Sequence, residues 1–223
     1  MNAILLPVKR FDDSKQRLAD FLTSAERTLL ARAMFEDVWA TLRCALELRQ
    51  GLDRLLVISA EPYVLACCQK KGIACMEESD PVSHSESVNR ATPWAMSLGV
   101  TSLLSVPIDT PGVTVGELVA MSQLRDQFAV VVAPSADGTG TNALLRTPPD
   151  AIGAHFGPDS RRRHLEEARA KGLSSEVFEC PGLMADMDTP EDLEKFLRLE
   201  RRCRTRSFVE QAMKGRREIT ACR

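Results

Sequence analysis

The sequence lacks the features that mark membrane proteins and proteins that wrap nucleic acids. No stretch approaches the roughly 20 consecutive apolar residues of a membrane-spanning helix, and the first residues have neither the basic nor the long apolar region of a signal peptide. The formal net charge is -2, whereas a protein that mainly covers nucleic acid is usually strongly basic. We therefore expect neither a membrane nor a nucleic acid among its partners.

Cysteines at the spacing of a zinc or redox motif are absent as well, and only Cys67 and Cys68 are adjacent. The chain has seven cysteines, but none are arranged as C-x-x-C, which disfavours a zinc ribbon and a thioredoxin-type redox centre. Unpaired thiols are typical of a reducing compartment, so we expect a cytoplasmic protein. Neither an internal repeat nor a dividing linker occurs, and 44% of the residues are hydrophobic, enough for a core. We expect one domain over residues 1–200 and a basic, solvated tail over 201–223.

What the chain does contain is an alternation of apolar runs and segments with helical periodicity. Strands are expected at 3–8, 55–59, 73–76, 103–107, 128–133, 143–146 and 177–179. Helices are expected at 25–49, 62–71, 88–98, 115–124 and 161–171 and from 190 onward, with Ser24 as the cap of the first. This alternation predicts an α/β fold with three layers and a mostly parallel sheet. Sheets of this kind bind ligands at the carboxyl ends of their strands.

A cluster of basic side chains directly follows the first expected strand. Lys9, Lys15 and Arg17 lie within one short segment. Lys and Arg can neutralise the charge of a polyphosphate while its α-phosphorus is attacked. The alternative is an ordinary solvated loop, but the position at the carboxyl end of a strand favours a binding role.

Two aspartates occupy junctions between strands and helices. Asp109 follows the fourth expected strand, and Asp188 precedes the last expected helix. Carboxylates in such places can hold one or two Mg²⁺ ions, because hard cations prefer oxygen ligands. Each aspartate can instead cap a turn or helix, and Asp186 is either a supporting partner or a turn residue. The presence of two such junctions in one sheet favours the metal site.

A glycine-rich loop, "DGTGTNALL", joins the fifth and sixth expected strands. Glycines let the backbone approach a ligand closely, and successive N–H groups can bind an anion. No G-K-[ST] follows, so this is not a Walker loop, and the dinucleotide fingerprint is also missing. A simple long turn is the alternative.

The segment "HFGPDSRRRH" comes next, and Ser160 within it can cap the following helix near an anion. The three consecutive arginines point in different directions around a helix, so at most two can face a site. His155 and His164 are nine residues apart, which is not the spacing of a metal site.

Four segments occur in the same order in a known family: "PVKRFDDSKQRL", "VPIDTP", "DGTGTNALL" with "FGPDS…H", and "DMDTPEDL". Over about residues 3 to 197, the chain resembles the CofC/FbiD guanylyltransferases of coenzyme F420 biosynthesis. The resemblance implies a glycosyltransferase-A-like, Rossmann-like nucleotidyltransferase fold, with GTP and a phosphorylated three-carbon acid as substrates. The phosphate of the acid attacks the α-phosphorus of GTP and pyrophosphate leaves, without a covalent enzyme intermediate.

The resemblance also implies roles for individual residues and a Mg²⁺ cofactor. Lys15 and Asp109 would be catalytic, and Asp109 and Asp188 would hold Mg²⁺. The expected nucleotide contacts are Lys9, Lys15, Arg17, Ser59 and Asn89. The expected acid contacts are Thr141, Gly157 and Ser160. The preference for guanine rests on the resemblance alone, and a homodimer is compatible with the sequence.

The chain departs from the family around "SESVNRA", where the family usually has Gly-Leu-Asn before a helix. Asn89 is kept, but His84, Glu86 and Ser87 make this segment more polar, and Thr110 stands where leucine is common. A polar pocket suits an acid with a free hydroxyl, because a buried hydroxyl needs a partner. The sequence therefore favours 3-phosphoglycerate over 2-phospholactate and phosphoenolpyruvate. The alternatives are another acceptor, such as a molybdopterin or a sugar phosphate, and a GTP-binding module without turnover.

Overall fold

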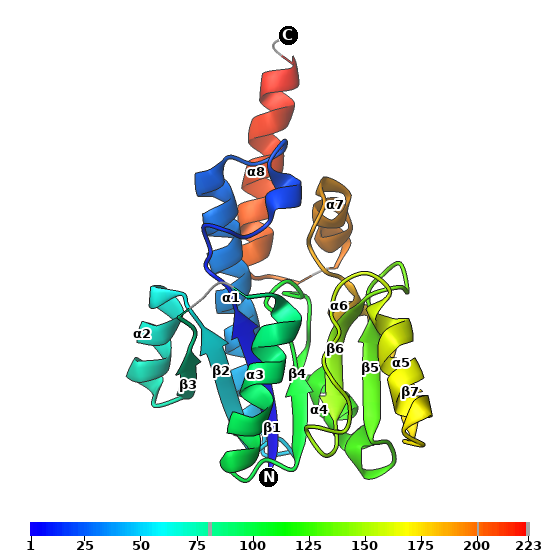
Figure 1. The fold of residues 1–223 in the computed structure, drawn as a ribbon. Coiled ribbons are helices and arrows are strands. Elements are labelled where there is room, and N and C mark those ends of the chain that lie inside the picture. Colours follow the sequence, from blue (N-terminus) through cyan, green and yellow to red (C-terminus); the bar gives the residue numbers. More distant parts are fainter. Residues whose placement is uncertain (80–81, 200, 222–223) are drawn as a thin grey trace.

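A single seven-stranded sheet organises the computed structural model, which describes residues 1–79, 82–199 and 201–221. The strands lie in the order β3-β2-β1-β4-β6-β5-β7 (Figure 1). Their bounds are β1 Asn2–Val8, β2 Arg54–Ser59, β3 Ala74–Glu77, β4 Ser102–Ser105, β5 Val130–Pro134, β6 Thr141–Arg146 and β7 Ser175–Val177. Only β6 runs antiparallel to its neighbours. The predicted mostly parallel sheet is confirmed.

Helices cover both faces of this sheet and complete the three layers. Their bounds are α1 Ser24–Glu47, α2 Pro62–Lys71, α3 His84–Ser97, α4 Val115–Gln123, α5 Ser160–Ala170, α6 Pro181–Met184, α7 Pro190–Arg198 and α8 Arg204–Ala221. The face that carries α1, α2 and α4 has one apolar cluster, and the face that carries α3 and α5 has another. In Figure 1, α7 and α8 stand above the carboxyl ends of the parallel strands. None of the described helices is long and apolar enough to span a membrane.

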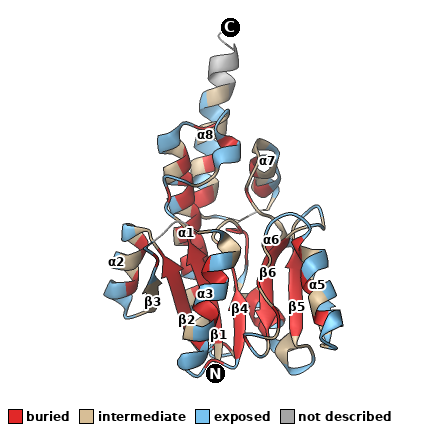
Figure 2. Ribbon diagram, in the orientation of Figure 1, coloured by how far each residue is buried: buried red, intermediate tan, exposed pale blue. Residues whose placement is uncertain are grey.

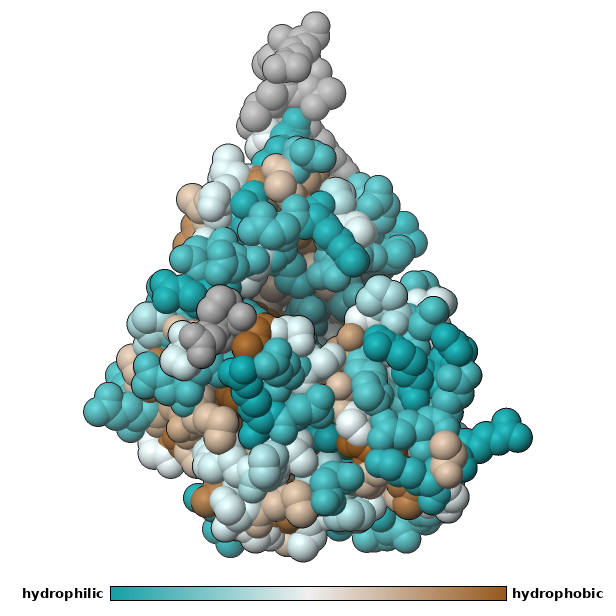
Figure 3. Space-filling view, in the orientation of Figure 1, coloured by the Kyte–Doolittle hydropathy of each residue, from teal (hydrophilic) through white to brown (hydrophobic). Residues whose placement is uncertain are grey.

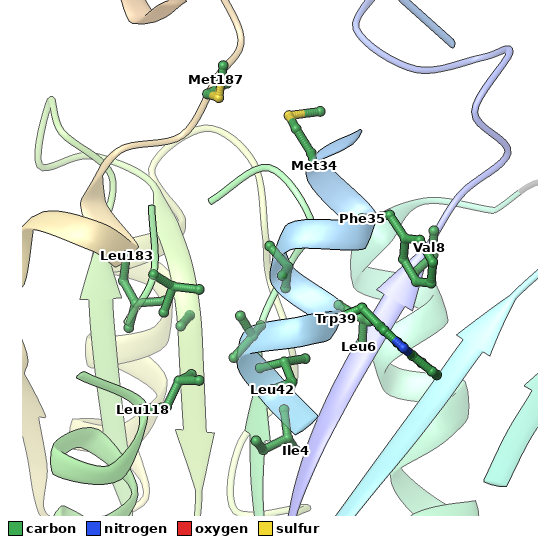
Figure 4. Packing of buried hydrophobic residues seen from close by; sticks show 14 of the residues in the cluster. Ile4, Leu6, Val8, Met34, Phe35, Trp39, Leu42, Leu118, Leu183 and Met187 are labelled. Carbon is green, nitrogen blue, oxygen red and sulfur yellow. The ribbon is translucent and has the colours of Figure 1, made fainter. Parts of the chain in front are cut away.

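The strands are buried on both faces, which explains their continuous apolar sequences (Figure 2). In β1, Ile4 and Leu6 point toward α1, whereas Leu5 belongs to the cluster under α3. This alternation follows from the two-residue period of a strand. Figure 4 shows Phe35 and Trp39 of α1 packed beside β1. Strand β1 is thereby fixed at the centre of the sheet, and the loop that leaves it starts from a rigid support.

The predicted cap of the first helix is wrong by one residue. Thr23, not Ser24, caps α1, and its side chain and Glu26 form a complete capping box. Helix α3 begins at His84, four residues before its predicted start, because Ser83 accepts a hydrogen bond from the backbone N–H of Glu86. Both differences arise where several polar residues in a row can serve as caps.

The order of the strands creates a switch point beside β1. The chain passes from β1 to β2 on one side, and later crosses from β3 to β4 on the other side. Ligands of open α/β sheets bind at such points, at the carboxyl ends of the strands. The loop after β1 and the loop after β4 both open here, so the basic segment and Asp109 come together at this edge.

The C-terminal segment is a packed helix and not the solvated tail that its basic composition predicts. Asp37 of α1 is buried and accepts hydrogen bonds from the backbone N–H groups of Arg204 (3.1 Å) and Thr205 (2.8 Å) at the start of α8. Val209 of α8 is fully buried against the same cluster as α1. The expectation of a solvated segment is therefore wrong for the first half of α8. The domain boundary at residue 200 stays a prediction.

We predict that Asp37→Ala lowers the free energy of unfolding by roughly 2 kcal/mol, because two backbone donors and the Thr205 hydroxyl lose their acceptor. Urea denaturation followed by circular dichroism measures this change. Glu210→Gln is the control, since it removes only a partly exposed i,i+4 pair with Arg206 and should stay within about 0.5 kcal/mol. Equal midpoints for wild type and Asp37→Ala would contradict the anchoring role.

Candidate active site

The side chain of Lys15 lies between two carboxylates at the switch point. Its Nζ is 2.9 Å from Asp188 Oδ1 and 3.4 Å from Asp109 Oδ2. The Lys15 side chain is only 6% exposed, whereas the two aspartates are each about one-third exposed. Arg17 reaches Asp188 Oδ2 at 3.5 Å from a largely exposed position. The structure thus brings together four residues that were predicted to be catalytic, to bind the nucleotide or to hold the metal ion.

The backbone holds Lys15 in a strained conformation. Its φ of 56° lies in the left-handed region, which non-glycine residues adopt at a cost. The residue directly precedes the short 3-10 helix Gln16–Leu18, whose Leu18 is fully buried. Packing of Leu18 therefore fixes the turn that carries Lys15 inward.

Neither aspartate is used as a helix cap. Thr114 caps α4 and Thr189 caps α7, each in a capping box with an acidic residue three positions later. The capping alternative is therefore wrong for Asp188, which stands next to a helix that Thr189 already caps. Asp109 lies five residues before the cap of α4. Both carboxylates remain available for Lys15 and for a ligand.

One hydrogen bond joins the loops that carry Asp109 and Asp188, and Asn142 of β6 supports the second loop; neither feature was predicted from the sequence. The backbone N–H of Met187 donates to the carbonyl of Asp109 at 3.1 Å. Asn142 Nδ2 donates to the carbonyl of Leu183 (2.8 Å) and to Asp186 Oδ1 (3.2 Å). Asn142 belongs to the segment "DGTGTNALL", and this membership was the only indication in the sequence that Asn142 belongs to the site. Asp186 is thus a supporting partner within the acidic loop.

Charge and burial act in opposite directions on this group. Burial alone would lower the pKa of Lys15, but the charges of Asp109 and Asp188, and the hydrogen bonds that Lys15 donates to both, outweigh burial and raise the pKa. Burial, the charge of Asp109 and, less strongly, that of Asp188 raise the pKa of Asp186. The ammonium group of Lys15 is therefore positive at neutral pH and keeps Asp109 and Asp188 close together.

The donor set fits a hard cation that is bound mainly through a substrate. Among the described residues, no cluster of three or more His, Cys, Asp or Glu side chains could hold a metal by itself. Asp109 and Asp188 supply two carboxylates, and Mg²⁺ is commonly bound by one or two carboxylates together with phosphate oxygens and water. Such a metal site is complete only when the nucleotide is bound and supplies its phosphate oxygens.

Lys9 lies in a separate ion pair and not beside Lys15. Its Nζ is 3.0 Å from Glu78 Oε2 and also contacts the hydroxyl of Ser87. Glu78 follows β3 and its side chain is only 3% exposed, and it accepts a 2.6 Å hydrogen bond from Ser87. The charge of Lys9 is thus compensated within the protein, and its contact with triphosphate stays a prediction.

Ser59 and Asn89, two further predicted nucleotide contacts, are occupied by bonds within the chain. The buried hydroxyl of Ser59 donates to the carbonyl of Val8 (2.8 Å) and accepts from the N–H of Glu61 (3.0 Å). The amide of Asn89 forms two bonds with the backbone of Ala154, of 2.8 and 3.1 Å. Asn89 also lines an open cavity of about 560 Å³ between α3 and the segment before α5. The described bonds give both residues structural roles, and direct nucleotide contact stays a prediction.

The predicted acid contacts gather at the N-terminus of α5. Thr141 Oγ1 lies 3.1 Å from Nδ1 of His164. Ser160 is fully buried, and no described residue forms a hydrogen bond with its hydroxyl. Gly157 has a φ of +106°, which a residue with a side chain adopts only with strain. A buried hydroxyl without a partner normally indicates a ligand or water, so this group suits an anionic substrate.

The glycine-rich loop itself is a closed turn and not an anion nest. Asp137 accepts hydrogen bonds from the N–H of Thr139 (3.0 Å) and from the hydroxyls of Ser135 and Thr139. The N–H of Gly140 donates to Ser135 Oγ at 2.8 Å, and a Cβ at Gly140 would approach that oxygen to 2.7 Å. The alternative of a simple turn is confirmed. Thr141, one of the predicted acid contacts, directly follows this turn at the start of β6.

The side chains of Arg161, Arg162 and Arg163 are bound locally. Arg161 donates to the carbonyl of Gly138, Arg162 pairs with Glu166, and Arg163 donates to backbone carbonyls between 155 and 158. The structure therefore does not direct any of the three guanidinium groups at the Lys15 group.

His84 and His164, for which no direct substrate contact was predicted, both pack against Phe156. His84 packs edge-on against Phe156 with ring centroids 4.5 Å apart, and no described residue forms a hydrogen bond with its ring. Burial lowers the pKa of His84 to about 4, and the charges of Asp109 and Lys9 act on it as well. Phe156 in turn lies edge-on to His164, 5.7 Å away. Figure 3 shows that the surface of this face is mostly hydrophilic and is hollowed near its middle, below α7 and α8.

The comparisons with known proteins agree with this geometry. The family model described as "Guanylyl transferase CofC like" matches residues 2–213. A phosphoenolpyruvate guanylyltransferase of Conexibacter woesei is 36% identical over 193 residues, covering 85% of this chain and 84% of that protein. A 2-phospho-L-lactate guanylyltransferase of Methanothermobacter thermautotrophicus is 33% identical over 192 residues, covering 85% and 81%.

A solved structure extends the likeness to the fold. It is described as a nucleotide-diphospho-sugar transferase of Desulfovibrio desulfuricans, and it superposes with a TM-score of 0.75 over 95% of each chain at 17% identity. The predicted fold class is confirmed by this match. At such low identity the likeness concerns the fold alone.

We predict that His164 makes the protein less stable in acid. Burial first, and then the charges of His155 and Arg146, lower the pKa of His164 to about 3, whereas the unfolded chain takes up this proton below about pH 6.5. The contribution of the neutral His164 ring to the free energy of unfolding is therefore lost as the pH falls from about 6.5 toward 3. Urea denaturation should show the stability difference between wild type and His164→Asn shrinking by on the order of 2 kcal/mol from pH 7 to pH 5. A difference that stays constant would contradict a buried neutral imidazole.

Proposed function

The chain belongs to the CofC-like guanylyl transferase family, and from that premise we propose that it transfers the GMP group of GTP to a phosphorylated three-carbon acid in coenzyme F420 biosynthesis. The observation that carries this proposal is the ammonium group of Lys15 between Asp109 and Asp188, at the switch point of the sheet. The names of the relatives, which include phosphoenolpyruvate and 2-phospho-L-lactate guanylyltransferases, support the same reaction.

The proposed reaction is a displacement at phosphorus. A phosphate oxygen of the acid forms a bond to the α-phosphorus of GTP, and the bond from that phosphorus to the oxygen bridging to the β-phosphate breaks. Pyrophosphate leaves with the electron pair of that bond. Catalysis then consists of placing the two substrates in line and neutralising the charge that develops on the leaving group. In this proposal Lys15 and Arg17, which both contact Asp188, neutralise that charge.

A divalent cation fits the carboxylate half of the site. Asp109 and Asp188 would hold Mg²⁺ together with phosphate oxygens of the nucleotide. When bound, the ion neutralises phosphate charge and keeps the triphosphate in place. The contact of Lys15 with both carboxylates indicates that a positive charge is accommodated between them.

The acid half of the site is built from neutral donors. Thr141 and Ser160 offer hydroxyls. The backbone N–H groups of Ser160 and Arg161 already donate to the carbonyls of Gly157 and Thr139, so the start of α5 contributes the positive end of its helix dipole. A carboxylate or phosphate group common to all three candidate acids fits such a site. The polar residues that favoured 3-phosphoglycerate are partly paired, because Ser87 bonds to Glu78 and Glu86 pairs with Arg90. His84 keeps a neutral ring without a described hydrogen-bond partner, so it is the residue that supports an acid with a free hydroxyl.

Two competing functions remain distinguishable. A nucleotidyltransferase with another acceptor would release pyrophosphate only with that acceptor, and a non-catalytic module would bind GTP without turnover. The matching family model and the two named relatives argue against both. A cytoplasmic location and a homodimer stay predictions.

We predict that Lys15→Met lowers kcat/KM for GTP by about 10²–10³-fold, because the leaving pyrophosphate loses a buried positive charge. Release of pyrophosphate in a coupled assay measures the effect. Arg10→Gln is the matched control, since Arg10 lies in the same loop and its side chain is half exposed in a pair with Asp12. An unchanged rate for Lys15→Met would contradict the proposed role of Lys15, and a loss of the same size in Arg10→Gln would show that the loop merely attracts anions.

The acceptor is identified by supplying GTP and Mg²⁺ with phosphoenolpyruvate, 2-phospholactate or 3-phosphoglycerate separately. We expect pyrophosphate release to depend on one of these acids, with none in their absence. If 3-phosphoglycerate is the acceptor, His84→Phe should lower kcat/KM for this acid about tenfold, because its free hydroxyl loses the imidazole as a partner. If 3-phosphoglycerate is the poorest acceptor, the preference inferred from the sequence is wrong. No release with any acid, despite GTP binding, would refute the proposed function.

A further inference from the structure

The hydrogen bonds around His164 determine which of its ring nitrogens carries the proton. The backbone N–H of His155 donates to Nε2 of His164 at 2.8 Å. A backbone amide can only donate, so Nε2 must offer its lone pair, and in the neutral ring the proton is then on Nδ1. Nδ1 lies 3.1 Å from Thr141 Oγ1, and it therefore donates to that oxygen.

The ring has little freedom to change this arrangement. His164 is fully buried, with Phe156 edge-on at 5.7 Å and the ring of His155 at 5.5 Å. A flip of the ring would break the bonds to both His155 and Thr141. The bond to the backbone thus acts through the imidazole and sets the direction of the bond to Thr141.

The hydroxyl hydrogen of Thr141 is left for a ligand. Its oxygen already accepts from His164, and no described residue accepts the hydrogen of its hydroxyl. Thr141 is 7% exposed and begins β6, close to the contacts expected for the acid. The hydroxyl can therefore donate outward, toward an oxygen that accepts a hydrogen bond.

We propose that His164 is a positioning residue that makes Thr141 a hydrogen-bond donor and thereby selects a carboxylate or phosphate oxygen of the acid substrate. This inference rests on the proposed function, which supplies the acid. His164 does not itself touch the substrate in this proposal. Its effect reaches the acid through the orientation of the Thr141 hydroxyl alone.

A matched pair of substitutions separates positioning from packing. In His164→Asn the amide nitrogen can take the place of Nδ1 and still donate to Thr141. In His164→Gln the amide oxygen can take the place of Nε2 and still accept from His155, but the donor to Thr141 is lost. Both variants lose the aromatic ring, so packing alone predicts the same result for the two.

We expect KM for the acid to rise about tenfold or more in His164→Gln and to stay within about threefold in His164→Asn, with KM for GTP unchanged in both. Thr141→Val supplies the background, because it removes the hydroxyl and keeps the shape. In that background the difference between Asn and Gln should disappear. Equal acid KM values for the Asn and Gln variants with Thr141 intact would overturn the proposal.

A measurement without turnover tests the same arrangement. Long-range ¹H–¹⁵N NMR spectra distinguish the two neutral tautomers of histidine, and the signals of His164 are those that vanish in His164→Asn. We expect a neutral ring protonated at Nδ1 at pH 7. A proton on Nε2, or on both nitrogens, would overturn the proposal even if the enzyme is active. If no acid supports turnover, the proposed function fails, and this spectrum still decides whether His164 orients Thr141.

Discussion

The contact of one buried ammonium group with two carboxylates governs the arrangement of this site. Lys15 lies in the segment after β1, Asp109 lies in the loop after β4, and Asp188 precedes α7. Three distant parts of the chain therefore meet at a single point. Buried ion pairs usually add little to stability, because removing charges from water costs about as much as their attraction returns. A stabilising role therefore explains this group poorly. Binding explains it better, because a set of charges fixed in advance is what the transfer of a nucleotidyl group requires.

The remainder of the site is arranged around that contact, to which Arg17 adds one largely exposed charge. Threonine caps at Thr114 and Thr189 satisfy the ends of α4 and α7, which leaves the neighbouring aspartates free. On the other side, burial keeps His84 and His164 neutral by lowering their pKa values to about 4 and about 3. The result is a charged half that suits a metal-bound triphosphate and a neutral half of hydroxyls that suits the second substrate. In the proposed function, this separation would let two anionic substrates lie close together while each is held by different chemistry.

The sequence was sufficient for the parts that depend on local pattern. Helix α2 has the predicted bounds, and the convergence of Asp109, Asp188 and Lys15 follows from the rule that parallel strands end at one edge. Other features depend on partners far along the chain. Lys9 pairs with Glu78, 69 positions away, and Asn142 holds a loop 41 positions away. The basic segment of α8 looked solvated because nothing local shows that Asp37 of α1 caps it. Such pairings are decided by tertiary packing, which a single sequence does not reveal.

The central claim is that Asp109 and Asp188 bind the nucleotide through a metal ion beside Lys15. Isothermal titration of wild type, Asp109→Asn and Asp188→Asn with a GTP analogue carrying a methylene bridge between the α- and β-phosphorus tests it directly. With Mg²⁺, each variant should bind the analogue at least about tenfold more weakly. With a chelator instead, neither variant should bind more weakly than wild type, because a negative charge facing the triphosphate has been removed. Losses of equal size with and without Mg²⁺ would contradict the metal site and leave the aspartates with a purely structural role.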